Sequence, residues 1–374
     1  MKILTIIGAR PQIIKAAAVS RAVVELFSNR IEEKILHTGQ HYDANMSQVF
    51  FDELGIPQPN YNLGVGSGSH GSQTAKMISG IEEILANEPF DGVILYGDTN
   101  STLAGAVAAS KLHIPVFHIE AGLRSFNMTM PEEINRIVCD QLSNICFAPT
   151  QTAVDNLRRE GFMDSPATFR DGKKRRVCNC GDVMYDNSIH FSSLARQRST
   201  ILQQLNLQPQ SYILATIHRD NNTDNPQRLE SILRALSDIA LQNHIRIILP
   251  LHPRTRKILE QSPALSLSGN PLISIIPPAS FFDITMLEQH AHLIMTDSGG
   301  VQKEAFFFEK PCIILRPETE WVEIVNHGAG IIADADYDRI TAAYRQLVDH
   351  PVRFPHLFGD AHAAEKILQT ILDY

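Results

Sequence analysis

The residues best suited to chemistry stand directly after short apolar runs. The segment 296–300, Thr-Asp-Ser-Gly-Gly, follows the run HLIM. Its paired residues Gly299 and Gly300 let backbone N–H groups approach a diphosphate at a helix N-terminus, and Ser298 opens that turn. Glu304 lies further along the same helix, where it can accept hydrogen bonds from ribose hydroxyl groups. A tight turn without a ligand is the alternative interpretation.

A second pattern suited to an anion follows the run KILTII. Gly8 favours a tight turn, and Pro11 suits the first turn of a helix. Arg10 and Lys15 place positive charge near that turn. A helix that begins at Pro11 and carries solvated basic residues explains the pattern equally well.

Carboxylates also stand at the ends of apolar runs. Asp98 follows VILYG, where it either takes part in proton transfer or caps the next helix. Glu120 follows VFHI, and a charge at the end of an apolar strand is costly unless it has a partner or a purpose. A salt bridge to Arg124 is the structural alternative for Glu120.

Three further residues complete the set of candidate proton-transfer groups. Glu132 and Glu133 open a predicted helix, where acidic residues also complement the helix dipole. His218 follows the run YILATI, and a histidine exchanges protons near neutral pH unless it serves only as a structural residue.

These residues depend on strands that alternate with helical segments, a pattern typical of parallel sheets. The pattern restarts after Asn187, which predicts two α/β domains: an N-terminal domain over 1–180 and a C-terminal domain over 181–355. We expect the terminal helix, about 356–374, to pack back on the first domain, with a hinge near 181–187. The polar segment 163–179 is predicted to form an exposed loop. In such sheets ligands bind outside the carboxyl ends of the strands.

Composition excludes several classes of protein. A chain of 374 residues with 44% hydrophobic and 20% charged residues is expected to fold as a globular protein. The net charge of −8 offers a nucleic acid no general attraction, although one anionic metabolite remains possible. The 5 cysteines show neither zinc-site nor disulfide spacing. With no signal region and no apolar run of about 18 residues, we expect a cytoplasmic protein without a membrane contact.

The chain resembles the non-hydrolysing UDP-N-acetylglucosamine 2-epimerases. The matching motifs occur in the family's order: G-A-R-P-Q-x-I-K, G-Q-H, Y-G-D-T-N-S-T-L-A, H-I-E-A-G-L-R, P-E-E-I-N-R, H-R and T-D-S-G-G-V-Q-K-E-A. The resemblance implies an α/β protein with two Rossmann-like domains whose parallel sheets face a central cleft, the GT-B-type architecture. It also implies a homodimer that needs no cofactor and no metal.

Carried over position by position, the resemblance implies roles for twelve residues. The catalytic residues are Asp98, Glu120, Glu132 and His218. The residues that bind UDP or substrate are Arg10, Lys15, Arg136, Ser298, Gly299, Gly300, Glu304 and Arg316. The implied reaction inverts C2 of a UDP-sugar by elimination of UDP to a 2-acetamidoglycal and re-addition, to supply surface polysaccharides such as lipopolysaccharide.

Substrate choice within the family stays open between UDP-GlcNAc and UDP-2,3-diacetamido-2,3-dideoxyglucuronate. The sequence motifs are more similar to those of enzymes that act on the diacetamidoglucuronate nucleotide, with GARPQ in place of GTRPE and TEWVE in place of TERPE. Gln12 and Trp321 therefore replace family residues near the cleft. A GT-B-type glycosyltransferase is the main alternative function. A hydrolysing epimerase and a non-catalytic UDP-sugar sensor are the others.

Overall fold

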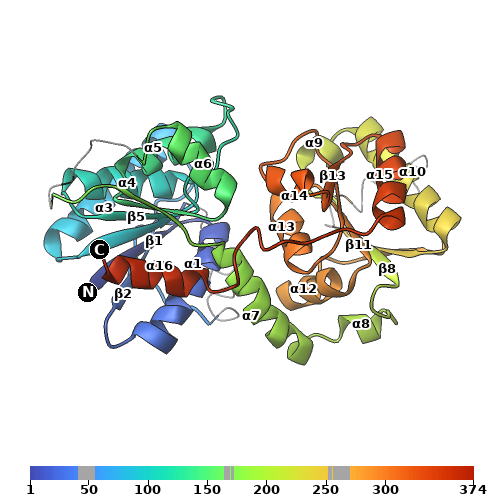
Figure 1. Ribbon diagram of the computed structural model, residues 1–374, viewed down its shortest axis with the longest axis horizontal. Coiled ribbons are helices and arrows are strands. Elements are labelled where there is room, and N and C mark those ends of the chain that lie inside the picture. The colour runs from blue at the N-terminus through green and yellow to red at the C-terminus, as the bar shows by residue number, and fades with distance from the viewer. Residues whose placement is uncertain (41–54, 164–168, 170–171, 252–254, 256–269) are drawn as a thin grey trace. The chain divides into compact units, whose positions relative to one another are not determined.

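The structure, a computed structural model, describes residues 1–40, 55–163, 169, 172–251, 255 and 270–374 (Figure 1). The chain divides into two compact units. The first unit contains Met1–Asn187 and His356–Tyr374, and the second contains Ser188–Pro355. Parts of the motif G-Q-H and of the predicted loop at 163–179 lie outside the described residues.

The first unit is built on a parallel sheet with the strand order β3-β2-β1-β4-β5-β6-β7. Its strands are β1 Lys2–Ile7, β2 Glu32–His37, β3 Tyr61–Asn62, β4 Gly92–Tyr96, β5 Val116–Ile119, β6 Ile145–Ala148 and β7 Arg176–Asn179. Its helices are α1 Arg10–Ala22 with the π-helical turn η1 Val23–Phe27, α3 His70–Asn87, α4 Asn100–Lys111, α5 Pro131–Leu142, α6 Gln151–Arg159 and α16 Ala363–Leu372.

The second unit has its own parallel sheet with the order β10-β9-β8-β11-β12-β13. Its strands are β8 Tyr212–Thr216, β9 Arg246–Pro250, β10 Ile273–Ile276, β11 Leu293–Thr296, β12 Cys312–Ile314 and β13 Gly330–Ile332. Its helices are α8 Ile201–Gln204, α9 Asp220–Thr223, α10 Pro226–Asn243, α12 Phe281–His290, α13 Gly299–Phe307, α14 Val322–Asn326 and α15 Tyr337–Asp349, and α7 Val183–Arg198 leads into this unit.

Both sheets have the strand order of the Rossmann fold, which confirms the predicted fold class. In this order the chain runs outward in one direction from the first strand and then returns to its other side. The reversal lies between β1 and β4 in the first unit, and between β8 and β11 in the second. Ligands of such sheets bind outside the carboxyl ends of the strands at this reversal. A ligand site is therefore expected at the segments that follow these four strands.

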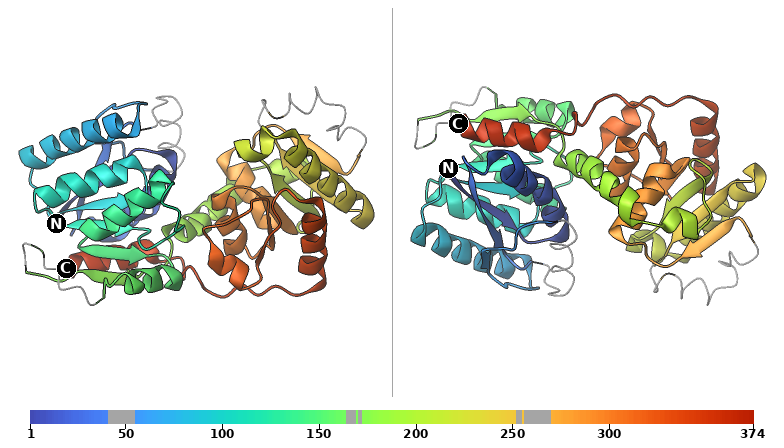
Figure 2. Two further views of the ribbon diagram at one scale, coloured as in Figure 1. Left: turned by 90° about the horizontal axis from the view of Figure 1, so that it is seen from above. Right: turned by 90° about the horizontal axis from the view of Figure 1, so that it is seen from below.

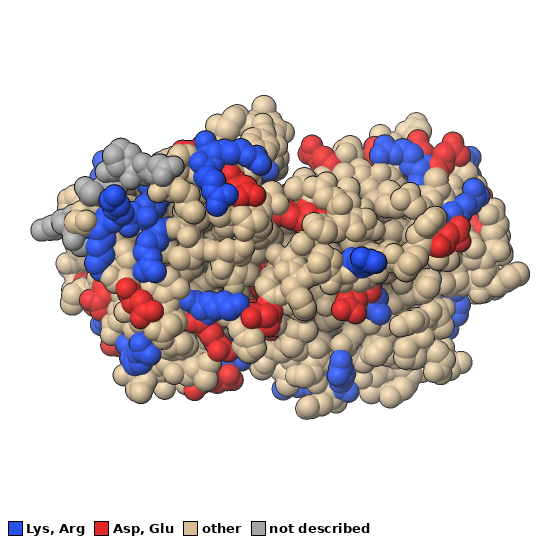
Figure 3. Space-filling model, in the orientation of Figure 1, with Lys and Arg blue, Asp and Glu red and all other residues tan. Residues whose placement is uncertain are grey.

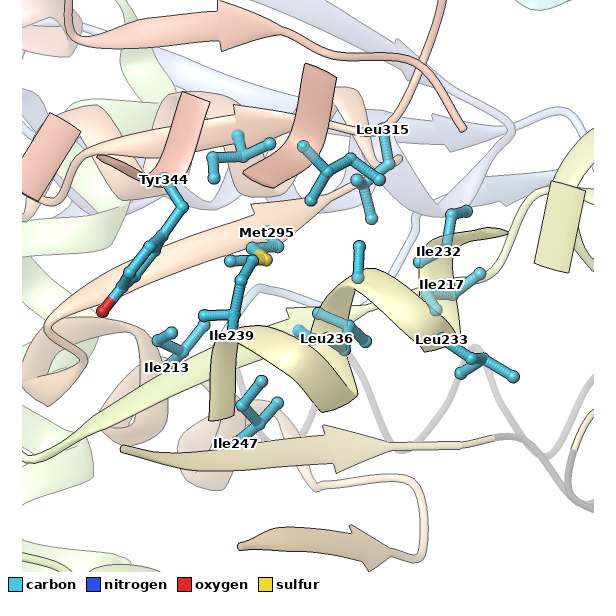
Figure 4. Close-up of a cluster of buried hydrophobic side chains, with 14 of the residues drawn as sticks. Ile213, Ile217, Ile232, Leu233, Leu236, Ile239, Ile247, Met295, Leu315 and Tyr344 are labelled. Carbon is cyan, nitrogen blue, oxygen red and sulfur yellow. The ribbon is translucent and has the colours of Figure 1, made fainter. Parts of the chain in front are cut away.

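Successive side chains of each strand point to opposite faces of its sheet, because side-chain direction alternates along a strand. On β8, Ile213 and Ala215 pack with α10 and α15, whereas Tyr212 and Leu214 pack with α12 and α13 on the other face. Figure 4 shows the first of these cores, where Met295 of β11 lies among leucine and isoleucine side chains of α10. Because both faces are covered, the strands read as nearly continuous apolar runs.

The end of the chain belongs to the first unit and is held there by a buried carboxylate. Helix α16 lies against α1 (Figure 2). The carboxylate of Asp186 accepts hydrogen bonds from the N–H groups of Ala363 and Ala364, at 3.0 and 2.8 Å, and so caps α16 from a distant part of the sequence. Nearby, Gly181 has φ +87°, and a Cβ there would lie 2.8 Å from the carbonyl oxygen of Phe358.

Two expectations from the sequence need correction. Part of the segment predicted to be a loop, Arg176–Asn179, forms the edge strand β7, which pairs in parallel with β6. Gly8 is required for space rather than for an unusual backbone angle, because a Cβ there would lie 2.1 Å from both the Ser101 and Thr38 hydroxyl oxygens.

The exposed surface carries both signs of charge. On the face drawn in Figure 3, Lys and Arg side chains are interspersed with Asp and Glu. Among the described residues, no helix is both long and apolar enough to cross a membrane.

The capping of α16 yields a stability prediction. Asp186→Ala removes the acceptor of two N–H groups of α16. We therefore expect the melting temperature of the first unit to fall by about 2 to 8 °C. Asp349→Ala, which changes an exposed residue at the end of α15, is the matched control and leaves that melting temperature unchanged. Differential scanning calorimetry measures both. Equal melting of the Asp186→Ala variant and the unmodified protein would show that the cap does not stabilise the unit.

Candidate functional site

The loop after β1 is fixed by Gln12, which is buried. Its side-chain oxygen accepts hydrogen bonds from the N–H groups of Gly8 and Ala9, at 2.8 and 3.1 Å. Its amide nitrogen donates to the Tyr96 carbonyl oxygen and to the Thr102 hydroxyl, at 2.9 and 3.0 Å. Gln12 therefore ties the loop after β1 to β4 and α4. Because this side chain is buried, it holds the loop and does not face a ligand.

Glu120 and Lys15 form an ion pair at the carboxyl end of β5. The pair joins a glutamate oxygen to the lysine ammonium group, and the side chains are 10% and 14% exposed. Glu120 has φ +70°, a left-handed conformation that is uncommon for a residue other than glycine and often occurs at functional sites. A Cβ on Gly97 would lie 3.1 Å from both charged atoms of the pair, so glycine at that position leaves room for it.

Asp98 is held by Arg136 and does not cap a helix. Thr99 is the N-cap of α4, whereas the Asp98 carboxylate accepts a hydrogen bond from the Arg136 guanidinium group. The other nitrogen of that guanidinium group donates to Glu133. Asn135 adds a hydrogen bond of 3.0 Å to the Asp98 carbonyl oxygen. The Asp98 side chain is 30% exposed, which leaves its carboxylate accessible to a ligand.

Of the two acidic residues that open α5, one is structural. Glu133 is buried and accepts hydrogen bonds from the N–H groups of Ser125 and Phe126, at 3.0 to 3.1 Å. Burial by itself raises the pKa of Glu133, but these N–H groups and Arg136 hold the pKa below its ordinary value. Glu132 is exposed. Only Glu132 is therefore available to solvent and ligands.

Asp297 fixes the corresponding loops of the second unit. This buried carboxylate accepts hydrogen bonds from the N–H groups of His218, at 3.0 and 3.1 Å, and of Arg219, at 3.1 Å. Asn222 donates to the same carboxylate, at 3.0 Å, and to the Leu315 carbonyl oxygen, at 3.0 Å. The loops after β8, β11 and β12 are thereby joined. The His218 side chain itself is exposed at the end of β8.

The predicted diphosphate motif begins helix α13, as expected. Ser298 is the N-cap, and its hydroxyl oxygen accepts from the Val301 N–H group. Gly299 and Gly300 lie in the first turn, where an α-helix leaves its N–H groups without an intrahelical acceptor. A Cβ on Gly299 would lie 2.5 Å from a carboxylate oxygen of Glu320, which also pairs with Arg316 at 2.9 Å. A negatively charged group thus already lies at this helix start, as the helix dipole favours.

Some of the other residues on and near α13 are partly exposed, and others are buried. Glu304 is partly exposed, and burial raises its pKa. Burial and the neighbouring Glu304 raise the pKa of Glu288, on α12, well above its ordinary value. Trp321 is only 5% exposed, and the Lys303 ammonium group lies 4.2 Å from the centre of its ring. Trp321 is therefore part of the interior of the second unit.

Each unit presents its own set of chemical groups at the ends of its strands. The first unit places Asp98 and Glu120 at neighbouring strands, β4 and β5, each with a cationic partner. Arg10 is exposed at the start of α1. The second unit presents a helix N-terminus with Arg316 beside it. Carboxylates can transfer protons, whereas a helix N-terminus binds phosphate. Among the described residues, no group of three His, Cys, Asp or Glu side chains is arranged to hold a metal ion.

For several residues that organise the site, no such role was predicted from the sequence. They are His118, Glu133 as a loop anchor, Asp140 and Asp297. One signal was present on α5, where Glu133, Arg136 and Asp140 recur at helical spacing on the buried face. Charged residues on a buried face require partners, and this requirement predicts an internal network.

Known proteins resemble this chain over its whole length. The family model described as UDP-N-acetylglucosamine 2-epimerase matches residues 25–372. A UDP-2,3-diacetamido-2,3-dideoxy-D-glucuronate 2-epimerase from Pseudomonas aeruginosa is 48% identical, with 99% of both chains covered. A UDP-N-acetylglucosamine 2-epimerase from Methanocaldococcus jannaschii is 40% identical over 99% of both.

Solved structures agree with these relatives. The Methanocaldococcus jannaschii UDP-GlcNAc 2-epimerase in complex with UDP-GlcNAc and UDP matches with a TM-score of 0.82 and 39% identity, covering 100% of both chains. A GT-B glycosyltransferase from Phytolacca americana, solved with UDP-2fluoro-glucose, matches with a TM-score of 0.61 at 12% identity, which shows a shared fold alone. The predicted resemblance is confirmed, and the chain belongs to the UDP-N-acetylglucosamine 2-epimerase family.

Proposed function

We propose that the chain is an isomerase that inverts C2 of a UDP-N-acetylhexosamine, from the gluco to the manno configuration. Family membership supports the class of reaction. The observation that carries the proposal is the placement of Asp98 and Glu120 at neighbouring strand ends, each held by a cation. We assign the sugar chemistry to the first unit and UDP binding to the second.

The reaction requires several acid–base groups because C2–H is not next to a carbonyl. Cleavage of the C1–O bond to UDP leaves positive charge at C1 and makes the C2 proton acidic. A carboxylate takes that proton as the C1=C2 double bond forms, which gives a 2-acetamidoglycal and UDP. Proton delivery to the opposite face of C2, with return of the UDP oxygen to C1, completes the inversion. Atoms and charges balance without a redox cofactor.

The geometry supports particular roles in this scheme. Glu120 and Asp98 are the first choices for proton transfer, with Glu132 and His218 as further candidates. The Gly299 and Gly300 N–H groups stabilise the departing diphosphate, where negative charge develops. Arg316, Arg10 and Lys15 add positive charge, and Glu304 accepts hydrogen bonds from the ribose. Arg136, whose guanidinium group binds Asp98 and Glu133, acts on substrate through its hold on Asp98.

We also infer the enzyme's setting. Resemblance to the family supports a homodimer, and a nucleotide-sugar substrate supports a cytoplasmic location. The product would serve as a precursor of surface polysaccharides.

Solvent isotope exchange tests the proposed reaction. In D2O the unmodified enzyme is expected to place deuterium at C2 of the recovered nucleotide sugar, because the proton removed exchanges before its return. Glu120→Gln removes a proton-transfer group, so we expect kcat and deuterium incorporation to fall together by about 10²- to 10⁴-fold. Mass spectrometry and NMR of the recovered sugar measure both quantities.

Glu83→Gln, an exposed change on α3, is the control and keeps full activity. No exchange with either candidate substrate would exclude the epimerase proposal. Sugar transfer to an acceptor would indicate a glycosyltransferase, and steady release of UDP would indicate a hydrolysing enzyme. Unchanged turnover in Glu120→Gln would remove Glu120 from the catalytic set.

We further propose that the diacetamidoglucuronate nucleotide is the preferred substrate. The 48% identity to an enzyme named for that substrate supports it, against 46% for a UDP-N-acetylglucosamine 2-epimerase homolog from Methanococcus maripaludis and 40% for the UDP-N-acetylglucosamine enzyme from Methanocaldococcus jannaschii. Parallel assays should then give the higher kcat/KM with the uronate nucleotide than with UDP-GlcNAc. A higher kcat/KM with UDP-GlcNAc would reverse the assignment while leaving the reaction class intact.

A further inference from the structure

His118 lies in the interior of the first unit with a hydrogen-bond acceptor at each ring nitrogen. Its side chain has 0% exposure. Nδ1 lies 2.7 Å from a carboxylate oxygen of Asp140, and Nε2 lies 2.7 Å from the carbonyl oxygen of Gly97. A neutral imidazole carries one N–H group, and a backbone carbonyl can only accept. Both contacts are satisfied together when His118 is a doubly protonated imidazolium ion.

Asp140 has the surroundings of an ionised carboxylate. Its second oxygen accepts from the Gly122 N–H group at 3.1 Å and lies 2.7 Å from the Arg124 guanidinium group. Burial by itself raises the pKa of Asp140, but His118 and Arg124 hold the pKa below its ordinary value. These two donors, one of them a cation, stabilise the ionised form of Asp140 and so favour the proton between His118 and Asp140 on His118.

The charges around this pair balance. Arg124 also pairs with Glu160, at 2.7 Å, so two cations face two anions. The thiol of Cys139 adjoins His118, and that of Cys146 donates to the Asp140 carbonyl oxygen. Burial lowers the pKa of His118, but Cys139 and Asp140 outweigh burial and raise the pKa well above its ordinary value.

The network holds the backbone directly before Asp98 and on either side of Glu120. Gly97, the acceptor of His118, directly precedes Asp98. On the other loop, Glu120 lies between His118, at the end of β5, and Gly122, which donates to Asp140. Since Glu120 adopts a left-handed conformation, its surroundings must hold it in place.

We propose that His118 and Asp140 are positioning residues. They form a permanently charged pair that holds the loops of Asp98 and Glu120 in fixed positions relative to each other during the reaction. Neither residue touches the substrate. His118 acts through the Gly97 carbonyl group, and Asp140 acts through the Gly122 N–H group. The kinetic part of this proposal rests on the proposed epimerase activity, whereas the charge state of His118 does not.

Nitrogen NMR of the whole protein, labelled with ¹⁵N-histidine, tests the charge state without a substrate. The signals that disappear in His118→Gln identify His118. Both ring nitrogens should have the shifts of protonated nitrogens from about pH 6 to about pH 9. In Asp140→Asn the same histidine should become neutral at neutral pH. An unprotonated ring nitrogen of His118 in the unmodified protein would overturn the proposal.

Kinetics tests the positioning role. His118→Gln keeps a hydrogen-bond donor but removes the charge, so we expect kcat and C2 exchange to fall by about 10²-fold while KM changes by less than about twofold. His113→Asn is the control, because His113 is exposed, with φ +59°, and asparagine tolerates that conformation. An unchanged kcat in a folded His118→Gln variant, or a raised KM with normal kcat, would contradict the role. If the unmodified protein turns over neither nucleotide sugar, the epimerase proposal fails while the NMR result still decides the charge state.

Discussion

Three loops near the carboxyl ends of the two sheets depend on one kind of interaction, a buried carboxylate that accepts hydrogen bonds from backbone N–H groups. Asp297 fixes the loop at His218, Glu133 fixes the loop at Ser125, and Asp140 fixes Gly122. Backbone N–H groups that leave a strand have lost their ladder partner and cannot stay unpaired when buried. A carboxylate satisfies several of them at once, and the backbone it holds then presents other side chains to a ligand.

In the first unit, ion pairs hold the two carboxylates that we propose for proton transfer. Glu120 pairs with Lys15, and Asp98 pairs with Arg136. Such pairs offset the cost of placing carboxylates at the end of an apolar sheet. They also fix the orientation of each carboxylate, which acid–base catalysis requires. In the second unit, the ion pair of Arg316 and Glu320 lies at the N-terminus of α13.

Much of this arrangement could be predicted from the sequence. The alternating runs predicted both parallel sheets, and the motifs predicted which residues would follow the strands. Strand β7 was missed because Arg176–Asn179 lies in a polar, basic segment, and an edge strand needs little apolar character.

The partners of the charged residues could not be predicted in the same way. Glu120 was expected to pair with Arg124 if it had a structural role, but it binds Lys15, which lies 105 positions away in the sequence. Arg124 is occupied by Asp140 and Glu160 instead. A pairing over such a distance follows from the strand order, in which β1, β4 and β5 become neighbours. Local sequence reveals that a buried charge needs a partner, whereas the topology decides which partner it has.

The assignment of UDP to the strand ends of the second unit is tested most directly by a crystal structure of the complex with UDP. The diphosphate should lie within hydrogen-bond distance of the Gly299 and Gly300 N–H groups, with the ribose against Glu304. Arg316 should contact the phosphates. A diphosphate bound away from the start of α13, with Glu304 facing no ribose, would contradict this account of the site.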